Sequence, residues 1–291
     1  MVDRIATIGF GEAAGAFAGA WSVHTAAYDL KLDDPAARDA MLARMTAHRV
    51  IAAQHVAAAI EGAELILSLV TAGSALEAAT VAADAITVGQ LYCDLNSVAP
   101  DTKRAAQTAI ERAGGRYVDV AVLAPVFPKR LAVPLLVSGA HAADAAAALN
   151  SAGFTNVSVL DGPVGAASSV KMIRSVMVKG IEALTAECVL AADTAGVLDA
   201  VIASLDASPP PRGWAETADY NLDRMMLHGR RRAEEMREVV RTLDALGTGS
   251  AMTRATVERQ EALARPGAPV PDGLTAKLDM LLGRTRAEAA E

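Results

Sequence analysis

Short apolar runs alternate with longer segments of helical spacing as far as Asp161. Short apolar runs bounded by Gly, Pro, Asn or Asp are typical of strands buried on both faces of a parallel sheet. The pattern predicts strands at 5–8, 23–28, 50–51, 64–70, 116–123, 134–138 and 156–160, with another beginning at Leu91. Helices are predicted between them at 35–48, 75–85, 101–113 and 142–151. This order predicts a doubly wound α/β domain with about eight strands.

The pattern changes after Asp161, where strand-like runs end. A single helix is predicted from Gly165 to Ala195, with a length of about 45 Å at 1.5 Å per residue. Further helices are predicted at 195–207, 216–246, 251–263 and 274–286, with a proline-rich break at 208–213. The sequence therefore predicts an α/β domain over 1–162 and an all-helical domain over 163–291.

The first strand runs directly into Gly9-Phe10-Gly11, and an alanine-rich helical stretch follows. In a dinucleotide-binding fold the first glycine permits a tight turn, and the second lets the backbone approach a pyrophosphate. A very small residue three positions later, here Ala14, lets the helix pack on the strand. A simple glycine turn is the alternative, but the flanking strand and helix patterns favour a Rossmann site for NAD or NADP.

The second predicted strand ends at Asp29, which is followed by Leu30 and Lys31. A carboxylate at this position accepts hydrogen bonds from the adenosine ribose and repels a 2′-phosphate, which favours NAD. Lys31 could instead pair with the 2′-phosphate of NADP. NAD is the predicted preference, and NADP stays open.

Ligands of open parallel sheets lie outside the carboxyl ends of the strands. Val70 and Thr71 follow one predicted strand, and Asn96 and Ser97 follow the next, just before a helix. A helix N-terminus favours an anion such as a substrate carboxylate. Taken alone, Ser97 fits a helix N-cap better than a substrate ligand. The predicted cofactor-binding residues are Gly9, Phe10, Gly11, Glu12, Ala13, Ala14, Asp29, Leu30, Lys31, Val70, Thr71 and Asn96.

Lys171 lies among Ala, Val, Met and Ile on the first turns of the predicted long helix. A lysine in such surroundings is unusual unless it is exposed or functional. Ser175 is one turn further on and faces the same way. These features make Lys171 a candidate general acid/base, although the pattern alone favours a snorkelling surface lysine. Lys179 lies on another face, with Glu182 as a partner, and is interpreted as structural.

The composition restricts the function further. The net charge of −7 and the lack of a run rich in Lys or Arg argue against nucleic acid or an anionic membrane as partner. No apolar stretch is long enough to span a membrane, and the N-terminus lacks the pattern of a signal peptide. We expect a cytoplasmic protein that acts on small molecules. Cys93 and Cys188 are predicted to be buried free thiols, and no metal site is expected.

Several segments carry a family resemblance in the order GFGEAA, DLNSVAP, VAVLAP and GPVGAASSVKMIRS. Over essentially its full length the chain resembles the β-hydroxyacid dehydrogenase superfamily, which includes 3-hydroxyisobutyrate and 6-phosphogluconate dehydrogenases. The resemblance implies a Rossmann domain, a long interdomain helix and an all-helical substrate and dimerisation domain. It also implies that Lys171 is the catalytic lysine and that Asn96 and Ser97 touch the substrate.

The chain departs from the family pattern at three places. Leu123-Ala124-Pro125 stands where the family has Ser-Gly-Gly, Ser175 replaces an asparagine, and Val178 replaces a second acid. The first change removes donors for an acid substrate, and the last removes the usual proton donor of a decarboxylating step. The resemblance therefore implies an outlying branch, whose helical domain is similar to that of 6-phosphogluconate dehydrogenases and whose substrate the resemblance does not define.

These observations predict hydride transfer between NAD(P) and the hydroxyl-bearing carbon of a small hydroxy acid or related alcohol. Imine reduction on the same scaffold and a non-catalytic dinucleotide-binding protein are the alternatives. Apolar stripes on the helices predict a homodimer through the helical domain. The predicted substrate-binding residues are Asn96, Ser97, Ser175, Leu123, Ala124 and, within a largely self-paired basic segment, His228.

Overall fold

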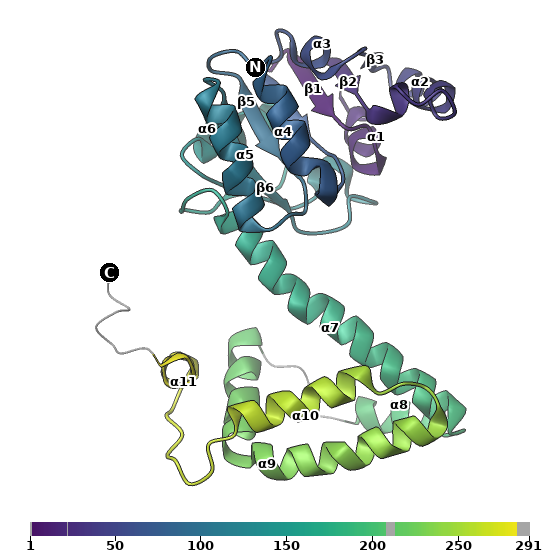
Figure 1. The fold of residues 1–291 in the computed structure, drawn as a ribbon, viewed down its shortest axis with the longest axis vertical. Helices are drawn as coiled ribbons and strands as arrows, with labels where there is room; N and C mark the ends of the chain where they lie inside the picture. The colour runs from purple at the N-terminus through teal and green to yellow at the C-terminus, as the bar shows by residue number, and fades with distance from the viewer. Residues whose placement is uncertain (1, 22, 208–212, 284–291) are drawn as a thin grey trace. The chain divides into compact units, whose positions relative to one another are not determined.

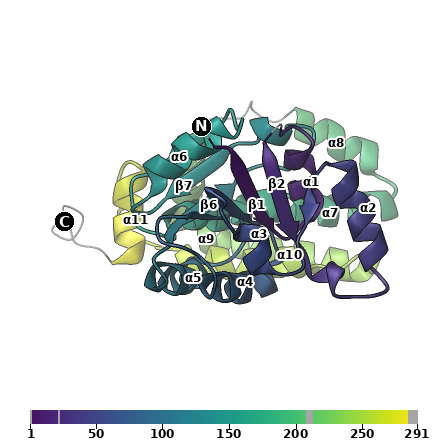
Figure 2. The same ribbon diagram turned by 90° about the horizontal axis from the view of Figure 1, so that it is seen from above.

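The computed structural model describes residues 2–21, 23–207 and 213–283. One eight-stranded sheet, in the order β3-β2-β1-β4-β5-β6-β7-β8, occupies its first part (Figure 1). The strands are β1 (Arg4–Ile8), β2 (His24–Tyr28), β3 (Ile51–Ala52), β4 (Leu65–Ser68), β5 (Leu91–Asp94), β6 (Arg116–Val122), β7 (Leu135–Ser138) and β8 (Val157–Val159). Neighbours run parallel, as β1 and β2 do in Figure 2, except β6 and β7. The predicted doubly wound sheet is confirmed.

The antiparallel pairing of β6 with β7 departs from the predicted all-parallel sheet. The connection between the two strands contains only the 3-10 turn Arg130–Ala132. Parallel neighbours need a longer crossover, usually through a helix. The chain therefore turns back and pairs β7 in the opposite direction.

Helices cover both faces of the sheet. They are α1 (Glu12–Ala18), α2 (Arg38–Ala47), α3 (Val56–Ile60), α4 (Ala75–Ala83), α5 (Pro100–Arg112) and α6 (Ala142–Ser151). Ile5 of β1 belongs to the same buried cluster as Phe17 of α1. The next residue, Ala6, belongs to the opposite cluster with Ile60 of α3 and Ala106 of α5. Successive side chains of a strand thus supply two separate core layers.

Several details differ from the predictions, and some elements are shorter than predicted, such as β4 and the helix predicted at 195–207, which spans Leu198–Asp206. α2 begins at Arg38 instead of Pro35, because Asp34 Oδ1 accepts the Ala36 N–H and forms an Asx turn before the helix. The short helix α3 was not predicted. Cys93 is a buried free thiol, as expected, whereas Cys188 is also free but exposed.

The described residues of the second part are helical, as predicted, whereas most of the predicted break at 208–213 and the last residues of the helix predicted at 274–286 lie outside the described residues. It contains α7 (Ala166–Thr194), α8 (Leu198–Asp206), α9 (Trp214–Leu246), α10 (Ala251–Leu263) and α11 (Leu274–Leu282). Met1–Val176 and Met177–Glu291 form two compact units, so α7 begins in the first unit and continues in the second. The functional boundary at 162/163 stays a prediction.

Close helix contacts and polar caps organise the second unit. α9 and α10 lie side by side (Figure 1), and a Cβ at Gly229 of α9 would stand 2.3 Å from the Gln260 carbonyl oxygen of α10. Glu187 of α7 accepts the N–H groups of Met252 and Thr253 at 2.9 Å, and so caps α10. Within the described ranges, no helix combines the length and apolar character needed to cross a membrane.

Candidate active site

The glycine-rich turn after β1 has the geometry that a dinucleotide requires. Gly9 has a φ of +89°, and a Cβ there would lie 2.5 Å from the Leu69 carbonyl oxygen. Its N–H donates to the Tyr28 carbonyl at 2.8 Å, which ties the turn to the end of β2. Among the described residues, nothing lies within 4 Å of a Cβ placed on Gly11. Position 9 thus requires glycine, and the backbone at position 11 is open to a pyrophosphate.

The Asp29 carboxylate lies beside this turn at the end of β2. Its Oδ2 accepts the Phe10 N–H at 2.7 Å, and its Oδ1 accepts the Lys31 N–H at 2.9 Å. The two backbone donors fix the orientation of the carboxylate, and each oxygen keeps acceptor capacity. Asp29 can therefore accept further hydrogen bonds from hydroxyl groups.

The surroundings of Asp29 are mainly acidic. The Tyr28 hydroxyl donates to Asp33 Oδ2. Burial, followed by this hydrogen bond and by the charges of Asp33 and Asp29, raises the pKa of Tyr28 to about 12. The side chains of Leu30 and Lys31 are exposed. Lys31 is the only cation between Asp29 and Asp34.

Two adjoining cavities lie along the carboxyl ends of the strands. The first has a volume of about 430 Å³ and is lined by Ile8, Gly9, Gly11, Tyr28, Asp29, Leu30, Lys31, His55, Val56, Leu69, Val70, Thr71, Ser74, Glu77, Ala78 and Val81. The second, of about 450 Å³, is lined by Glu12, Ala13, Leu69, Val70, Ala72, Leu95, Asn96, Ser97, Val122, Ala124, Pro125, Val126 and Lys171. Leu69 and Val70 line both, so the cavities meet at the end of β4.

Most predicted cofactor-binding residues line one of these cavities. Phe10 and Ala14 do not, because they are buried beneath the turn against Met41 and Met45 of α2. Their contribution is to pack the turn on α2. Leu123 and Ser175 also lie outside the two linings.

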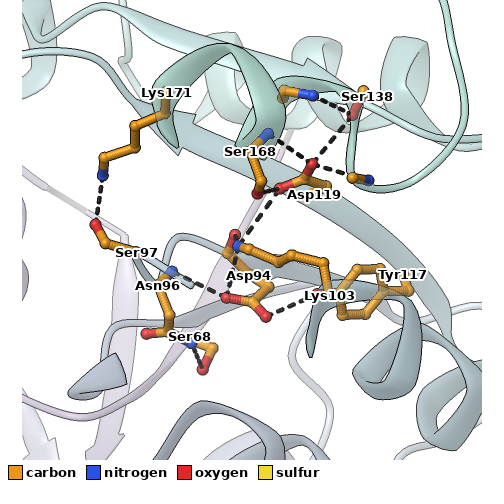
Figure 3. A network of polar contacts seen from close by, with 12 residues as sticks. Ser68, Asp94, Asn96, Ser97, Lys103, Tyr117, Asp119, Ser138, Ser168 and Lys171 are labelled. Carbon is orange, nitrogen blue, oxygen red and sulfur yellow. Dashed lines mark hydrogen bonds and ion pairs between the residues drawn. The ribbon is translucent and has the colours of Figure 1, made fainter. Parts of the chain in front are cut away.

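Lys171 of α7 reaches the end of β5, as Figure 3 shows. Its Nζ donates to Ser97 Oγ at 2.5 Å, and both residues line the second cavity. Ser97 does not cap a helix, because the N-cap residue of α5 is Ala99, without a side-chain bond. The capping interpretation of Ser97 is therefore wrong, and the serine instead holds the lysine.

A buried carboxylate fixes the start of α7. Asp119 of β6 accepts the N–H groups of Gly165 and Ser168 at 3.0 Å and the Ser168 hydroxyl at 2.5 Å. The Ser138 hydroxyl donates to the same carboxylate at 3.3 Å. A carboxylate at a helix N-terminus satisfies free N–H groups and complements the helix dipole. Lys171 is only three residues beyond Ser168. This cap therefore fixes the position of the backbone from which the Lys171 side chain extends.

Lys103 of α5 connects that cap to the end of β5 (Figure 3). The lysine is fully buried, and its Nζ donates to the main-chain oxygen of Asp94 at 2.6 Å and to its carboxylate at 2.9 Å. The same Nζ lies 3.5 Å from Asp119 Oδ1. The Tyr117 hydroxyl donates to the second Asp94 oxygen at 2.7 Å. One ammonium therefore joins the carboxylate that accepts the Asn96 N–H to the carboxylate that caps α7.

None of these three charges was predicted, although the sequence contains a signal for each. Asp94 and Asp119 lie in otherwise apolar strands. Lys103 shares the buried face of α5 with Ala106 and Ile110. Charged residues at buried positions are rare unless they are paired.

Asn96 links the ends of β4 and β5. Its Oδ1 accepts the Val70 N–H at 2.7 Å, and its Nδ2 donates to Ser68 Oγ at 2.9 Å. Its own N–H donates to Asp94 Oδ1. The side chain thus has internal partners at both ends and holds the wall shared by the two cavities.

Ser175 and Arg174 extend the polar face of α7. Ser175 Oγ donates to the Lys171 carbonyl at 2.9 Å, within its own helix. Arg174 Nη1 donates to the Leu123 carbonyl at 3.3 Å. The helix therefore contacts the loop after β6 as well as the end of β5.

His228 lies in the second unit. With Arg230 and Arg231 it lines a cavity of about 230 Å³, whose other walls are Met226, Leu227, Gly229, Ala264 and Pro266. The side chains of Lys179 and Glu182 lie outside the described ones, so their predicted pairing stays a prediction. In the described part of the chain, no group of three or more His, Cys, Asp or Glu residues could hold a metal ion.

Family comparisons match both parts of the chain. Residues 4–148 match the NAD binding domain of 6-phosphogluconate dehydrogenase. Residues 192–263 match a domain of unknown function, DUF1932. The first match contains the glycine-rich turn, Asp29, Asn96 and Ser97.

Solved structures resemble the whole chain. A conserved hypothetical protein from Sinorhizobium meliloti is 39% identical, with 98% of this chain and 97% of that chain covered and a TM-score of 0.61. The conserved protein MTH1747, of unknown function and described as similar to 3-hydroxyacid dehydrogenases, is 29% identical over 89% of this chain and 96% of its own, with a TM-score of 0.58. An imine reductase from Myxococcus stipitatus, in complex with NADP+, shares the fold at 18% identity, with 96% and 99% covered and a TM-score of 0.72.

Proposed function

Because the chain belongs to the β-hydroxyacid dehydrogenase superfamily, we propose that it transfers a hydride between NAD(P) and the hydroxyl-bearing carbon of a small hydroxy acid or related alcohol. Membership supports NAD(P)-dependent oxidoreductase chemistry in general. The observation that carries the specific proposal is the contact between Lys171 and Ser97, in a cavity that adjoins the glycine-rich turn.

Lys171 is the proposed general acid/base. During oxidation its neutral amine takes the proton of the substrate hydroxyl group, and the hydride leaves the carbon that bears this hydroxyl. During reduction its ammonium donates that proton to the forming alkoxide. Ser97 keeps the lysine Nζ at the end of β5 and can donate or accept a hydrogen bond at the same substrate oxygen.

The residues around the first cavity fit a dinucleotide. The backbone at Gly9 and Gly11 would hold the pyrophosphate, since the turn is tight and open there. Asp29 would accept hydrogen bonds from the ribose hydroxyls. Val70 and Thr71 would contact the part of the dinucleotide that extends toward the second cavity. The nicotinamide, when bound, supplies the carbon that exchanges the hydride.

NAD is the proposed preferred cofactor. The orientation of Asp29 and the nearby Asp33 support this choice, because both carboxylates disfavour a 2′-phosphate. Lys31 is the residue that would support NADP. Imine reductases of similar fold are found in complex with NADP+ and, as a variant, with NAD+.

The substrate is proposed to lie against Ser97 and Ala124 in the second cavity. We propose that Asn96 and Ser175 help to orient the substrate indirectly. Asn96 supports the cavity wall, and Ser175 donates a hydrogen bond to the Lys171 carbonyl. Leu123 belongs to the same loop as Ala124 and contributes its carbonyl to Arg174.

A homodimer through the helical domain, which we place at 163–291, is also proposed. Large apolar side chains of the second unit are exposed in the single chain, among them Leu190 at 58% and Leu205 at 56%. A second copy would cover them. His228 is proposed to reach the substrate of the partner in that dimer.

Two alternatives remain to be separated from this proposal. Imine reduction is favoured only by the similarity of the fold to imine reductases. A lysine as proton donor is a weak argument against imine reduction. A non-catalytic dinucleotide-binding protein would lack turnover altogether.

The deciding experiment is a panel of small hydroxy acids, alcohols and keto acids, with NAD or NADP and their reduced forms, followed at 340 nm. We expect turnover of hydroxy acids and reduction of the matching keto acid without amine. Reduction that requires an added amine would support imine reduction. Tight cofactor binding without any turnover would support a binding protein.

A further inference from the structure

The second cavity offers few polar side chains to a bound molecule. The loop after β6 lines it with Val122, Ala124, Pro125 and Val126, whose side chains are all apolar. The Asn96 amide already has a partner at both ends. Glu12 would repel an anion, so Ser97 and Lys171 are the lining side chains that can bind one.

Arg174 adds a cation beside the apolar loop. Its Nη1 donates to the carbonyl of Leu123, the residue between the lining residues Val122 and Ala124. The side chain is exposed, and the described residues give it no carboxylate partner. A guanidinium has five N–H donors in a planar fork, so most of its donors stay available.

Lys171 and Arg174 are three residues apart on α7, a spacing that brings Cβ atoms within about 5–6 Å of each other. Lys171 extends to the end of β5, and Arg174 extends to the loop after β6. Lys171 therefore lies in the cavity lining, and Arg174, which is not itself a lining residue, lies beside the loop that forms one wall. A hydroxyl and a carboxylate a few bonds apart match this arrangement.

We propose that Arg174 binds the substrate carboxylate and makes the enzyme selective for acids over neutral alcohols. The inference rests on the proposed function and deepens it. It assigns acid recognition to a helix residue, in a site where the loop after β6 supplies no side-chain donor. The hydrogen bond to the Leu123 carbonyl holds the guanidinium beside the cavity wall, and its remaining N–H groups would bind the carboxylate.

The test compares Arg174→Gln and Arg174→Lys with the wild type. Arg112→Gln is the matched control, since Arg112 is an exposed arginine in the last turn of α5, at the opposite end of the sheet. Each protein is assayed with a small 3-hydroxy acid that the wild type oxidises and with its primary amide. We expect Arg174→Gln to lower kcat/KM for the acid by about 10- to 100-fold, mainly by raising KM. The value of kcat/KM for the amide should stay unchanged.

Arg174→Lys is expected to recover part of the acid preference, because it restores the charge without the planar fork. Arg112→Gln should match the wild type on both substrates. An equal loss on acid and amide would show a structural role, and an unchanged preference in Arg174→Gln would equally overturn the proposal.

Binding provides a second readout that does not need turnover. Isobutyrate and isobutyramide are titrated into the complexes of the enzymes with NADH, using the fluorescence of the reduced nicotinamide. Isobutyrate should bind the wild type at least about tenfold more tightly than Arg174→Gln, whereas isobutyramide should not distinguish them. If no hydroxy acid turns over, the proposed function fails, but isobutyrate binding still decides the role of Arg174. Equal binding of isobutyrate by both proteins would refute it.

Discussion

Lys171 Nζ lies 2.5 Å from Ser97 Oγ, although the two residues are 74 positions apart. Asp119 fixes the first turn of the helix that carries Lys171, and Asp94 lies at the end of the strand that leads to Ser97. Lys103 contacts both carboxylates. The position of the proposed acid/base thus depends on three buried charges outside the cavity lining.

Replacing Lys171 by methionine should reduce turnover by about two to four orders of magnitude and leave cofactor affinity nearly unchanged. The methionine fills similar space but cannot transfer a proton. Steady-state kinetics on a substrate from the panel and calorimetric titration with NAD measure the two effects.

Two further variants define the result. Ser97→Ala should retain more activity than Lys171→Met, because it removes a positioning hydrogen bond and not the proton carrier. Lys129→Met, at an exposed position after β6, should leave turnover unchanged. If Lys171→Met keeps more than about a tenth of wild-type turnover with chemistry rate-limiting, the proposed mechanism is wrong.

Lys103→Met should destabilise the protein by about 3–5 kcal/mol, because it leaves Asp94 and Asp119 buried without their shared cation. The free energy of unfolding in urea is the quantity to measure. Lys129→Met serves as the exposed control, with an expected change within about 0.5 kcal/mol. A similar small change for Lys103→Met would show that the carboxylates do not need the ammonium.

The fold could be predicted because its signals are local. Short apolar runs predicted the strands. The predicted bounds are correct for two of the helices, Ala142–Ser151 and Ala251–Leu263. The turn at Gly9 and Gly11 was equally visible, since its geometry depends on residues a few positions apart.

The support of the site could not be predicted in the same way. The burial of Lys103 depends on two carboxylates from separate strands, and no periodicity within α5 identifies them. Ser97 has the residue type of a helix cap, but a tertiary contact with Lys171 uses its hydroxyl instead. In both cases the deciding partners come from distant parts of the chain.

Asp29 should give NAD at least about a tenfold advantage over NADP, or about 1.4 kcal/mol. Asp29→Ala should narrow this difference, because it removes both the acceptor for the ribose and the charge that repels a 2′-phosphate. Calorimetry with both cofactors measures the ratio, and Lys31→Ala serves as the comparison. Equal or tighter binding of NADP by the wild type would assign the choice to Lys31.

Glu187→Gln should weaken the helical unit in a pH-dependent manner. Burial raises the pKa of Glu187, but the hydrogen bonds from Thr253 and Met252 outweigh it and hold the pKa below its ordinary value of 4.5. The charged carboxylate therefore contributes its full stability above the ordinary value, and this contribution is lost as the pH falls through the folded value.

At pH 7 the expected cost of Glu187→Gln is about 1 kcal/mol, typical of a lost helix cap. The difference from the wild type should shrink as the pH is lowered below about 4.5. Urea unfolding across this pH range measures the effect, with Glu258→Gln as an exposed control on α10. A difference that stays constant with pH would mean that the charge on Glu187 does not stabilise α10.

The proposed dimer should be visible by light scattering at micromolar concentration. Leu190→Glu should convert it to a monomer, because it places a charge on an apolar surface that a second copy would cover. Val88→Glu is the matched control, since Val88 is 88% exposed and lies in the first unit. A wild-type monomer under these conditions would contradict the dimer.

His228 tests whether the partner completes the site. If it reaches the substrate of the partner, His228→Ala should lower kcat/KM by about tenfold while the protein remains a dimer. The Leu190→Glu monomer should show at least the same loss, because it separates every active site from the partner's helices. The double variant should lose no more kcat/KM than the Leu190→Glu monomer alone, since both substitutions remove the same contact. An unchanged kcat/KM in His228→Ala would place this histidine outside the active site even in a dimer.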